Sequence, residues 1–271
     1  MSPRPYRPNY QEREGLPLTI ALGVLASDGW VLAADRQVTS GNSKWSHGKV
    51  SLFAGFGGDS GRGYCSTAGA GTPGYLRQCS RKISSLFKHN PEADLDGLQR
   101  VFNDWFVEFC GKHVIPFAGF PFEQRPGVDM VIAVERRGQA RLWATDGNAI
   151  VDSEPYVAIG SGASVASPLL DRLYTLPLLT AKQSVMLAGY LIASAKETEI
   201  NCGKGIDMVY LGPQGLTMIP RHITSTIEEL SIRAANRLEP MFWRHVWGAG
   251  DIDNGVGEIL SAYRQIMDDL P

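Results

Sequence analysis

The sequence predicts an α+β domain in which antiparallel sheets are packed between layers of helices. Predicted strands occur in hairpins, predicted helices follow them in pairs, and no connection has the strand–helix–strand spacing of a parallel sheet. Of the 271 residues, 44% are hydrophobic and 20% are charged, which is typical of a globular protein with a full core. No internal repeat or linker divides the chain, so we expect one domain with short appendages.

The first predicted element is a hairpin over residues 19–38. An apolar stretch that begins at Thr19 is separated by Ser-Asp-Gly from a second stretch that ends at Asp35. Turn residues between two apolar runs favour a hairpin. Antiparallel pairing about this turn places Thr19 opposite residues 36–38. We therefore expect Asp35 to lie beside Thr19 at the same edge of the sheet.

The remaining elements are predicted from periodicity and turn residues. A polar loop, 39–48, follows the first hairpin. Strands are predicted at 49–53, 64–69, 128–134, 139–144, 156–159, 206–211 and 215–218. Helices are predicted at 72–88, 94–112, 163–174 and 181–199, with one or two more in 223–268. Thr180 and Gln183 form a capping box before the fourth helix. The apolar stripe of helix 94–112 indicates a core-facing surface rather than a cofactor site.

Composition argues against several classes of function. The formal net charge is −2 and no basic run contains interleaved aromatic residues, so we do not expect nucleic-acid binding. Residues 1–14 are polar and contain three prolines, without the apolar core of a secretory signal. No apolar stretch approaches the length of a membrane span. We therefore expect a cytoplasmic protein without membrane contact.

The cysteines and histidines do not have metal-binding spacing. Neither a CxxC pair nor an HExxH motif occurs, and the five histidines are scattered. Reduced thiols are the ordinary state of cysteines in a cytosolic protein. We therefore expect four free thiols, no metal and no cofactor. The four cysteines are Cys65, Cys79, Cys110 and Cys202.

Thr19 is the candidate nucleophile. A threonine at the start of a buried strand becomes catalytic when the residues before it are removed, because its freed α-amine then acts as base for its own hydroxyl. Such an amine titrates with a pKa of about 7.7–8.0 and is therefore partly neutral near pH 7. This hypothesis makes residues 1–18 a leader or propeptide and places the processing site between Leu18 and Thr19.

An ordered set of motifs resembles the proteasome β-type subunits, which are N-terminal-nucleophile hydrolases. The matches occur in the same order and with nearly the same spacing over residues 19–218. They are Thr19–Val24 with Val31–Arg36, Val38–Thr39, Gly48–Val50, Thr67–Gly69, Ile159–Gly162 and Ser194–Asp207. The resemblance implies a four-layer αββα sandwich over residues 19–222, usually assembled into stacked rings. Residues 223–271 would form a C-terminal helical extension, longer than in an ordinary β subunit. The bacterial HslV and Anbu types both remain open as placements.

The resemblance also implies roles for individual residues. Lys49 would lie beside the Thr19 hydroxyl and lower the cost of forming an alkoxide, and Asp35 would pair with Lys49. Gly69 would offer its backbone N–H to the developing oxyanion, where a side chain would obstruct the approach. Two further segments would bind an extended peptide by strand-like hydrogen bonds, Thr39 and the backbone around Thr67.

A supporting cluster near the amine of the nucleophile is implied as well. It comprises Ser161, Glu199 and Cys202. Glu199 stands where the family usually has aspartate, Cys202 stands where it has serine, and Lys204 interrupts the expected pair of glycines. Leu18 stands where β precursors normally carry glycine before the threonine.

The sequence therefore predicts a threonine-type endopeptidase subunit of a proteasome-like particle. Its substrates would be unfolded proteins or peptides, and its partners would be like subunits in a ring and an ATP-dependent unfoldase. Two alternatives stay open. The chain could be a non-catalytic structural subunit of such a ring, or an N-terminal-nucleophile amidase that acts on small molecules.

Overall fold

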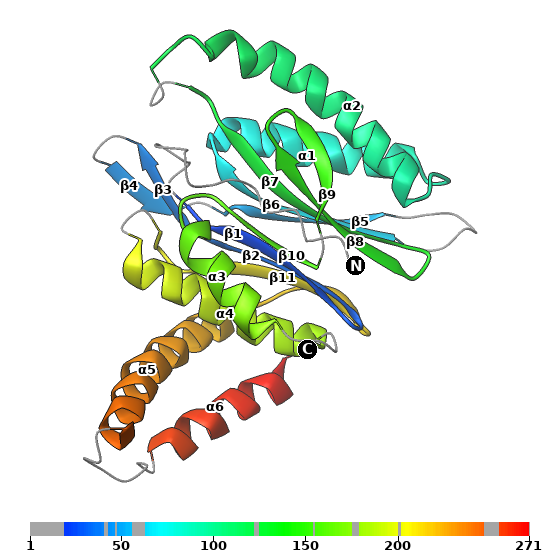
Figure 1. Ribbon diagram of the computed structural model, residues 1–271. Helices are drawn as coiled ribbons and strands as arrows, with labels where there is room; N and C mark the ends of the chain where they lie inside the picture. Colours follow the sequence, from blue (N-terminus) through cyan, green and yellow to red (C-terminus); the bar gives the residue numbers. More distant parts are fainter. Residues whose placement is uncertain are drawn as a thin grey trace, which may run out of the picture.

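Two antiparallel sheets and the helices that cover them make up the computed structural model. It describes residues 19–40, 43–46, 48–55, 63–121, 125–153, 155–174, 179–199, 202–246 and 255–270. Within these residues, two five-stranded sheets face each other between two layers of helices (Figure 1). The α+β class is therefore confirmed. The predicted leader, with Leu18, lies outside the described residues.

The first sheet contains the predicted first hairpin. Its strand order is β10-β1-β2-β11-β12. These strands are β1 (Ala21–Ala26), β2 (Gly29–Asp35), β10 (Tyr156–Ile159), β11 (Ile206–Gly212) and β12 (Gly215–Met218). Ala21 pairs with Ala34, and the Asp35 N–H donates to the Ile20 carbonyl at 3.1 Å. This register is the one predicted, and it brings the chain before β1 next to the end of β2.

The second sheet has the strand order β5-β6-β7-β8-β9. These strands are β5 (Val50–Gly55), β6 (Gly63–Gly71), β7 (Val128–Arg136), β8 (Gln139–Asp146) and β9 (Ala149–Ser153). The two sheets approach closely at Gly23, where an added Cβ would lie 2.7 Å from Val131 Cγ1. Small residues such as Ala34, Ala68 and Ala70 belong to the core between the two sheets. The site described below lies at one end of this interface.

Helices cover the outer face of each sheet. Helices α1 (Pro73–His89) and α2 (Leu95–His113) cover the second sheet, and a short 3-10 turn, Ile115–Phe117, follows α2. Helices α3 (Ala163–Leu173) and α4 (Ala181–Thr198) cover the first sheet. The predicted capping box of α4 is present, and the apolar stripe of α2 lies in the core. None of the helices described is long and apolar enough to span a membrane.

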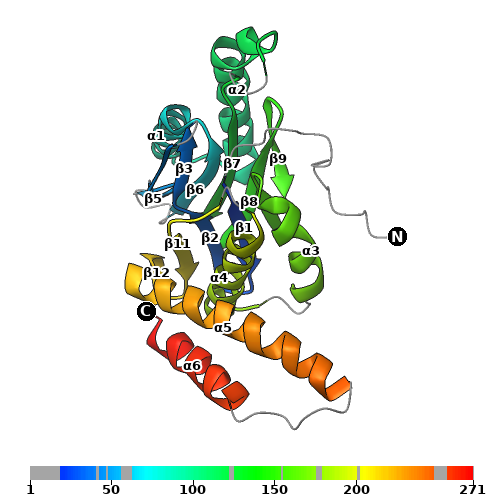
Figure 2. The same ribbon diagram turned by 90° about the vertical axis from the view of Figure 1, so that its left-hand side faces the viewer.

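The C-terminal region forms two helices, α5 (Arg221–Val246) and α6 (Gly255–Asp269), outside α4 (Figure 2). The start of α5 is held where Thr224 Oγ1 donates to the Ile206 carbonyl at 3.1 Å, and by an ion pair between Lys196 and Glu228. The end of α6 is held where Lys182 Nζ donates to the Leu270 carbonyl. The extension is thus attached to α4 near both of its ends.

Two predictions of the loop regions are wrong. The segment 39–48, predicted as a loop, contains most of a small hairpin of β3 (Gln37–Ser40) and β4 (Ser43–Ser46). Its strands are polar, so they lack the apolar alternation from which strands are predicted. The edge strand β9 was also not predicted, because it is short and only Ile150 and Ser153 are buried.

Candidate active site

Thr19 and Asp35 meet at the edge of the first sheet. Thr19 lies two residues before β1, and Asp35 is the last residue of β2. Thr19 is 2% exposed and Asp35 is fully buried. The Thr19 hydroxyl donates to Asp35 Oδ1. The hairpin register alone therefore places a carboxylate against the hydroxyl of the candidate nucleophile.

The Asp35 carboxylate is surrounded by hydrogen-bond donors. Oδ1 accepts from the Ile20 N–H at 3.0 Å and from Lys49 Nζ at 2.7 Å, besides the Thr19 hydroxyl. Oδ2 accepts from the N–H groups of Gln37, at 3.1 Å, and Gly203, at 3.0 Å. A buried carboxylate is tolerated when its oxygens are satisfied in this way. Asp35 thus ties together the three segments that form the site.

Lys49 reaches the same point from the second sheet. It precedes β5, its side chain is 5% exposed, and Nζ donates to both Thr19 Oγ1 and Asp35 Oδ1. Burial lowers the pKa of Lys49 below its ordinary value of 10.5, and the negative charge of Asp35 opposes this shift. The Thr19 hydroxyl therefore accepts from a cation while it donates to an anion, an arrangement that polarises the O–H bond.

The predicted Gly-Ser-Gly turn holds the backbone of Thr19. The Gly162 N–H donates to the Thr19 carbonyl at 3.2 Å, and Ser161 Oγ donates to the same oxygen at 3.4 Å. Gly160 has φ +85, and a Cβ there would collide with the Thr19 carbonyl. The resemblance implied that Ser161 supports the amine of the nucleophile. The structure instead places its hydroxyl on the carbonyl of that residue.

Cys202 is packed behind this turn and connects it to α4. A Cβ on Gly162 would lie 2.9 Å from the thiol sulfur. Burial, followed by the charges of Asp35 and Glu199, raises the pKa of the Cys202 thiol to about 12, although Lys49 and a hydrogen bond with Ser161 oppose this shift. A thiol with this pKa is protonated near neutral pH, which argues against Cys202 as an independent nucleophile. All four cysteines are free, as the sequence predicts, and all four are buried.

Glu199 lies at the C-terminal end of α4 and is half-buried. Its carbonyl accepts from the Cys202 N–H at 2.9 Å, and its charge acts on the thiol. The next two residues after Cys202 complete the turn. Gly203 donates to Asp35, and Lys204, with φ +62, takes a left-handed conformation that favours glycine. The segment that departs from the family pattern therefore still closes the site.

The backbone of Gly69 is oriented toward the site. Gly69 lies opposite Met130 of β7, and the Met130 N–H donates to Thr145 Oγ1 of β8 at 2.8 Å. Successive residues of an antiparallel strand turn their N–H groups to opposite sides. Gly69 therefore directs its N–H away from β7, toward the edge where β5 begins at Val50. This is the edge from which Lys49 enters the site, so the Gly69 N–H faces the same side as Lys49.

The space beside Gly69 is occupied by α1. A Cβ there would lie 2.6 Å from Leu76 Cδ2 of α1 and 3.2 Å from the Asp129 carbonyl. It would therefore point toward α1 and collide with Leu76. Glycine at this position allows α1 to pack closely on β6.

Thr67 itself lies in the interior of the second sheet. Thr67 pairs with Ser51 of β5 on one side and with Ile132 of β7 on the other. Its backbone is therefore not left for a peptide, and its hydroxyl shares a hydrogen bond of 2.8 Å with Ser80 Oγ. Residues 69–71 extend past the start of β5 and pair, among the described strands, with β7 alone. An extended peptide would add to this edge.

The sequence prediction missed two residues of the site, Arg36 and Asp207, although both lie within the motifs that carry the family resemblance. Arg36 forms an ion pair with Asp207, and its N–H donates to the carbonyls of Gly203 and Gly205 at 3.1 Å. This pair fixes the end of β2 against the start of β11.

Thr39 follows on β3, opposite Lys44. Within the described residues, no cluster of histidine, cysteine, aspartate and glutamate is arranged to hold a metal ion.

Comparison of the sequence with known proteins identifies proteasome subunits. A family model described as proteasome subunit matches residues 122–211. Proteasome subunit beta 1 of Thermococcus sibiricus is 25% identical over 206 residues, which span 73% of this chain and 88% of that protein. The corresponding subunit of Korarchaeum cryptofilum is 25% identical over 212 residues, spanning 77% and 95%.

Comparison of the fold identifies Anbu proteins. The Anbu (Gly-1) mutant from Hyphomicrobium sp. strain MC1 superposes with a TM-score of 0.66 at 16% identity, covering 87% of this chain and 99% of that one. Anbu from Yersinia bercovieri, described as an ancestral beta-subunit, gives 0.63 at 15% identity, with coverage of 83% and 97%. The predicted resemblance to proteasome-like N-terminal-nucleophile hydrolases is confirmed, and the chain is proteasome-like in sequence and fold.

Proposed function

We propose that this chain is a threonine-type endopeptidase subunit of a proteasome-like particle. In this proposal, removal of residues 1–18 frees the α-amine of Thr19, which then serves as the base for its own hydroxyl. The observation that carries the proposal is the position of the Thr19 hydroxyl between the Lys49 ammonium and the Asp35 carboxylate. Both charged side chains are almost fully buried, so their charges act on that oxygen with little screening.

The first half of the proposed reaction forms an ester. The neutral α-amine takes the proton of the Thr19 hydroxyl while Oγ1 attacks the carbonyl carbon of the scissile bond. The carbonyl oxygen becomes an oxyanion and accepts the N–H of Gly69. When the carbon–nitrogen bond breaks, the protonated α-amine returns the proton to the departing amine. The products are a new amino terminus and an acyl-enzyme at Thr19.

The second half of the proposed reaction hydrolyses this ester. A water molecule gives a proton to the α-amine and attacks the ester carbonyl, and the Gly69 N–H again stabilises the oxyanion. Breaking of the ester bond restores the Thr19 hydroxyl with that proton. Lys49 remains a fixed positive charge beside Oγ1 in both halves, and Asp35 holds it there. No further base is required.

A non-catalytic subunit is the second candidate, and one observation favours it. Leu18 precedes Thr19 where β precursors normally carry glycine. If the bond between these two residues persists, the amine remains an amide nitrogen and cannot act as a base. The chain would then keep the fold and the ring contacts without the chemistry.

Hydrolysis of fluorogenic peptides by the purified protein tests the proposal. We expect turnover that Thr19→Ala abolishes and that Thr19→Ser, which keeps the hydroxyl, retains in measurable part. Inertness toward peptides, in protein whose circular dichroism shows it to be folded, would contradict the proposal and favour the non-catalytic subunit. Turnover of small amides without turnover of peptides would instead assign an amidase.

The assembly, the substrates, the compartment and the partner of this chain belong to the same proposal. The family match supports assembly of like subunits into a ring, and unfolded proteins or peptides are the substrates that such a ring would enclose. We propose the cytoplasm as the compartment and an ATP-dependent unfoldase as the partner that supplies the substrate. Cross-linking followed by mass spectrometry in the source cell would identify both.

A further inference from the structure

A small cavity borders the candidate nucleophile on the side of α1. It lies between the start of β5, the end of β6 and the first turns of α1. Its lining includes Lys49, Ser51, Gly71, Leu76, Arg77 and Ser80. Because Lys49 also contacts the Thr19 hydroxyl, a substrate whose carbonyl meets that hydroxyl has this cavity beside it.

The lining of this cavity is positively charged and contains no carboxylate. Lys49 is already engaged by Asp35 and Thr19. Arg77 is exposed, and its guanidinium has no hydrogen bond or ion pair with any residue that the structure describes. Ser80 is buried and shares a hydrogen bond of 2.8 Å with Thr67, so this hydroxyl pair can turn to donate to an anion. The cavity therefore offers a positive charge and a hydroxyl donor, neither of them neutralised by an acidic side chain.

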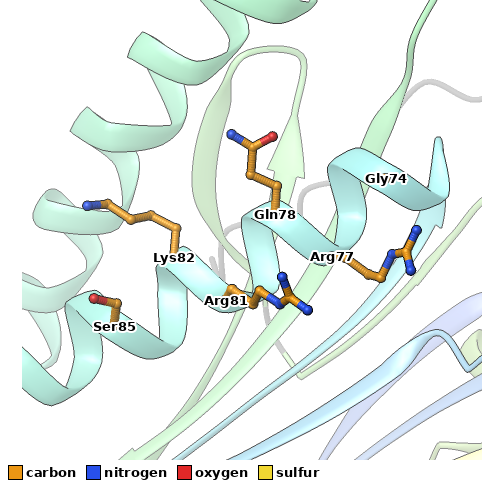
Figure 3. A pocket seen from close by; sticks show the side chains of 6 residues that line it. All are labelled: Gly74, Arg77, Gln78, Arg81, Lys82 and Ser85. Carbon is orange, nitrogen blue, oxygen red and sulfur yellow. The ribbon is translucent and has the colours of Figure 1, made fainter.

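The positive charge continues along α1, a helix without a single aspartate or glutamate. Arg77 and Arg81 lie one turn apart and extend on one side of this helix, whereas Gln78 and Lys82 extend toward the other (Figure 3). Lys112 lowers the pKa of Glu108 on α2 by a hydrogen bond and by its charge, and the charge of Lys82 adds to this shift. The two arginines have no such acidic neighbour among the described residues, so they add to the positive potential beside the cavity.

We propose that this cavity receives the side chain of the residue before the scissile bond and that Arg77 selects an acidic one, aspartate or glutamate. The inference rests on the proposed function, because it assigns the substrate class of that site. The carbon that bears this side chain is bonded to the carbonyl carbon that Thr19 attacks, so the side chain reaches the cavity next to the hydroxyl. A guanidinium matches a carboxylate in geometry as well as charge, whereas Lys49 and Arg77 together repel a basic side chain.

Two matched peptides test this specificity. They differ only in glutamate or glutamine before the fluorophore, which changes charge with little change in shape. We expect the unsubstituted protein to favour the glutamate peptide about fivefold in kcat/KM at low salt, the upper range for an ion pair as exposed as Arg77 allows. Arg77→Gln should bring the ratio to about one. Arg81→Gln makes the same charge change one turn away, outside the cavity, and should change the ratio less than twofold.

Binding provides a readout that does not depend on turnover. Fluorescence anisotropy of labelled peptides that end in glutamate or glutamine, and so have no bond after that residue to be cut, is measured on the unsubstituted protein and on Arg77→Gln. Tighter binding of the glutamate peptide, lost with Arg77→Gln, supports the inference even if nothing is hydrolysed, in which case the proposed function alone fails. Hydrolysis or binding without a preference for glutamate, a preference that Arg77→Gln leaves intact, or no binding at all overturns the inference.

Discussion

Asp35→Asn is the substitution that examines the centre of the site most sharply. It preserves the shape of the side chain but replaces one oxygen with a donor and removes the charge. Asp35 is fully buried and accepts hydrogen bonds on both oxygens. In the asparagine variant, the side-chain NH₂ group would therefore face other donors and leave them without an acceptor. The ammonium of Lys49, itself 5% exposed, loses its counter-ion at the same time.

The expected loss of stability follows from this burial. Removing one partner of a buried ion pair costs about 3–5 kcal/mol, because the remaining charge is left uncompensated. Lys49 limits the cost by releasing its proton, since burial already lowers its pKa and the charge of Asp35 is what opposes that shift. We therefore expect about 3 kcal/mol in the free energy of unfolding, measured by urea denaturation with linear extrapolation.

A matched control compares the buried ion pair of Asp35 and Lys49 with an ion pair on the surface. Asp96 pairs with Arg141 on the surface, where the side chains are 67% and 38% exposed. Asp96→Asn should cost less than about 1 kcal/mol. Adding Lys49→Met to Asp35→Asn should recover part of the loss, because it removes the stranded charge. The reasoning is refuted if both Asp→Asn variants cost the same, or if the effects of Asp35→Asn and Lys49→Met simply add.

The remaining predictions concern three single residues, Lys49, Cys202 and Lys204. Lys49→Met should lower kcat for peptide hydrolysis by at least about 100-fold with a smaller change in KM, and an unchanged kcat would show that the cation is not used. The Cys202 thiol, with its pKa raised to about 12, holds a proton that the unfolded chain releases near pH 9, so urea unfolding should show stability falling as pH rises above 9, less steeply in Cys202→Ser. Native Cys202 should also resist alkylation at pH 8, and rapid alkylation would contradict its burial. Lys204→Gly should raise the free energy of unfolding by up to about 1 kcal/mol by relieving φ +62, and a loss would show that its side chain contributes more than its backbone costs.

Local patterns were sufficient for most of the elements and for one contact of the site. A turn between two apolar runs fixes the register of β1 and β2, and this register brings Asp35 beside Thr19. Helix α4 was predicted to within a residue at each end because a capping box marks its start. These predictions depend on neighbours in the sequence, for which periodicity and turn chemistry are informative.

Contacts between distant segments could not be derived from periodicity. Lys49 reaches Thr19 from the other sheet, and Gly203 donates to Asp35 from a turn far along the chain. The order of strands in each sheet sets these distances, and only the resemblance to a family indicated them. Hydrogen-bond partners were harder still, because the resemblance placed Ser161 near the amine of Thr19, whereas its hydroxyl donates to the carbonyl of that residue.

The polar hairpin shows a different limit. Strands β3 and β4 pair from Gln37 to Ser46, and each contains a single apolar residue, Val38 or Trp45, so hydrophobic pattern does not distinguish their sequence from a loop. Thr67 shows a related limit. The pattern placed it on the right strand but could not show that this part of the strand lies inside the sheet. Pairing on both sides, by β5 and β7, is a property of the whole sheet.

The central claim is that Thr19 acts with a free amine, and the intact mass of the purified full-length protein tests it most directly. The account predicts a mass that lacks residues 1–18, so that the chain begins at Thr19. It also predicts that Thr19→Ala, which removes the hydroxyl needed to cut that bond, retains the full mass. A full-length mass for the unsubstituted protein, or cleavage at any other bond, would contradict the claim, because the amine of Thr19 would then not be free.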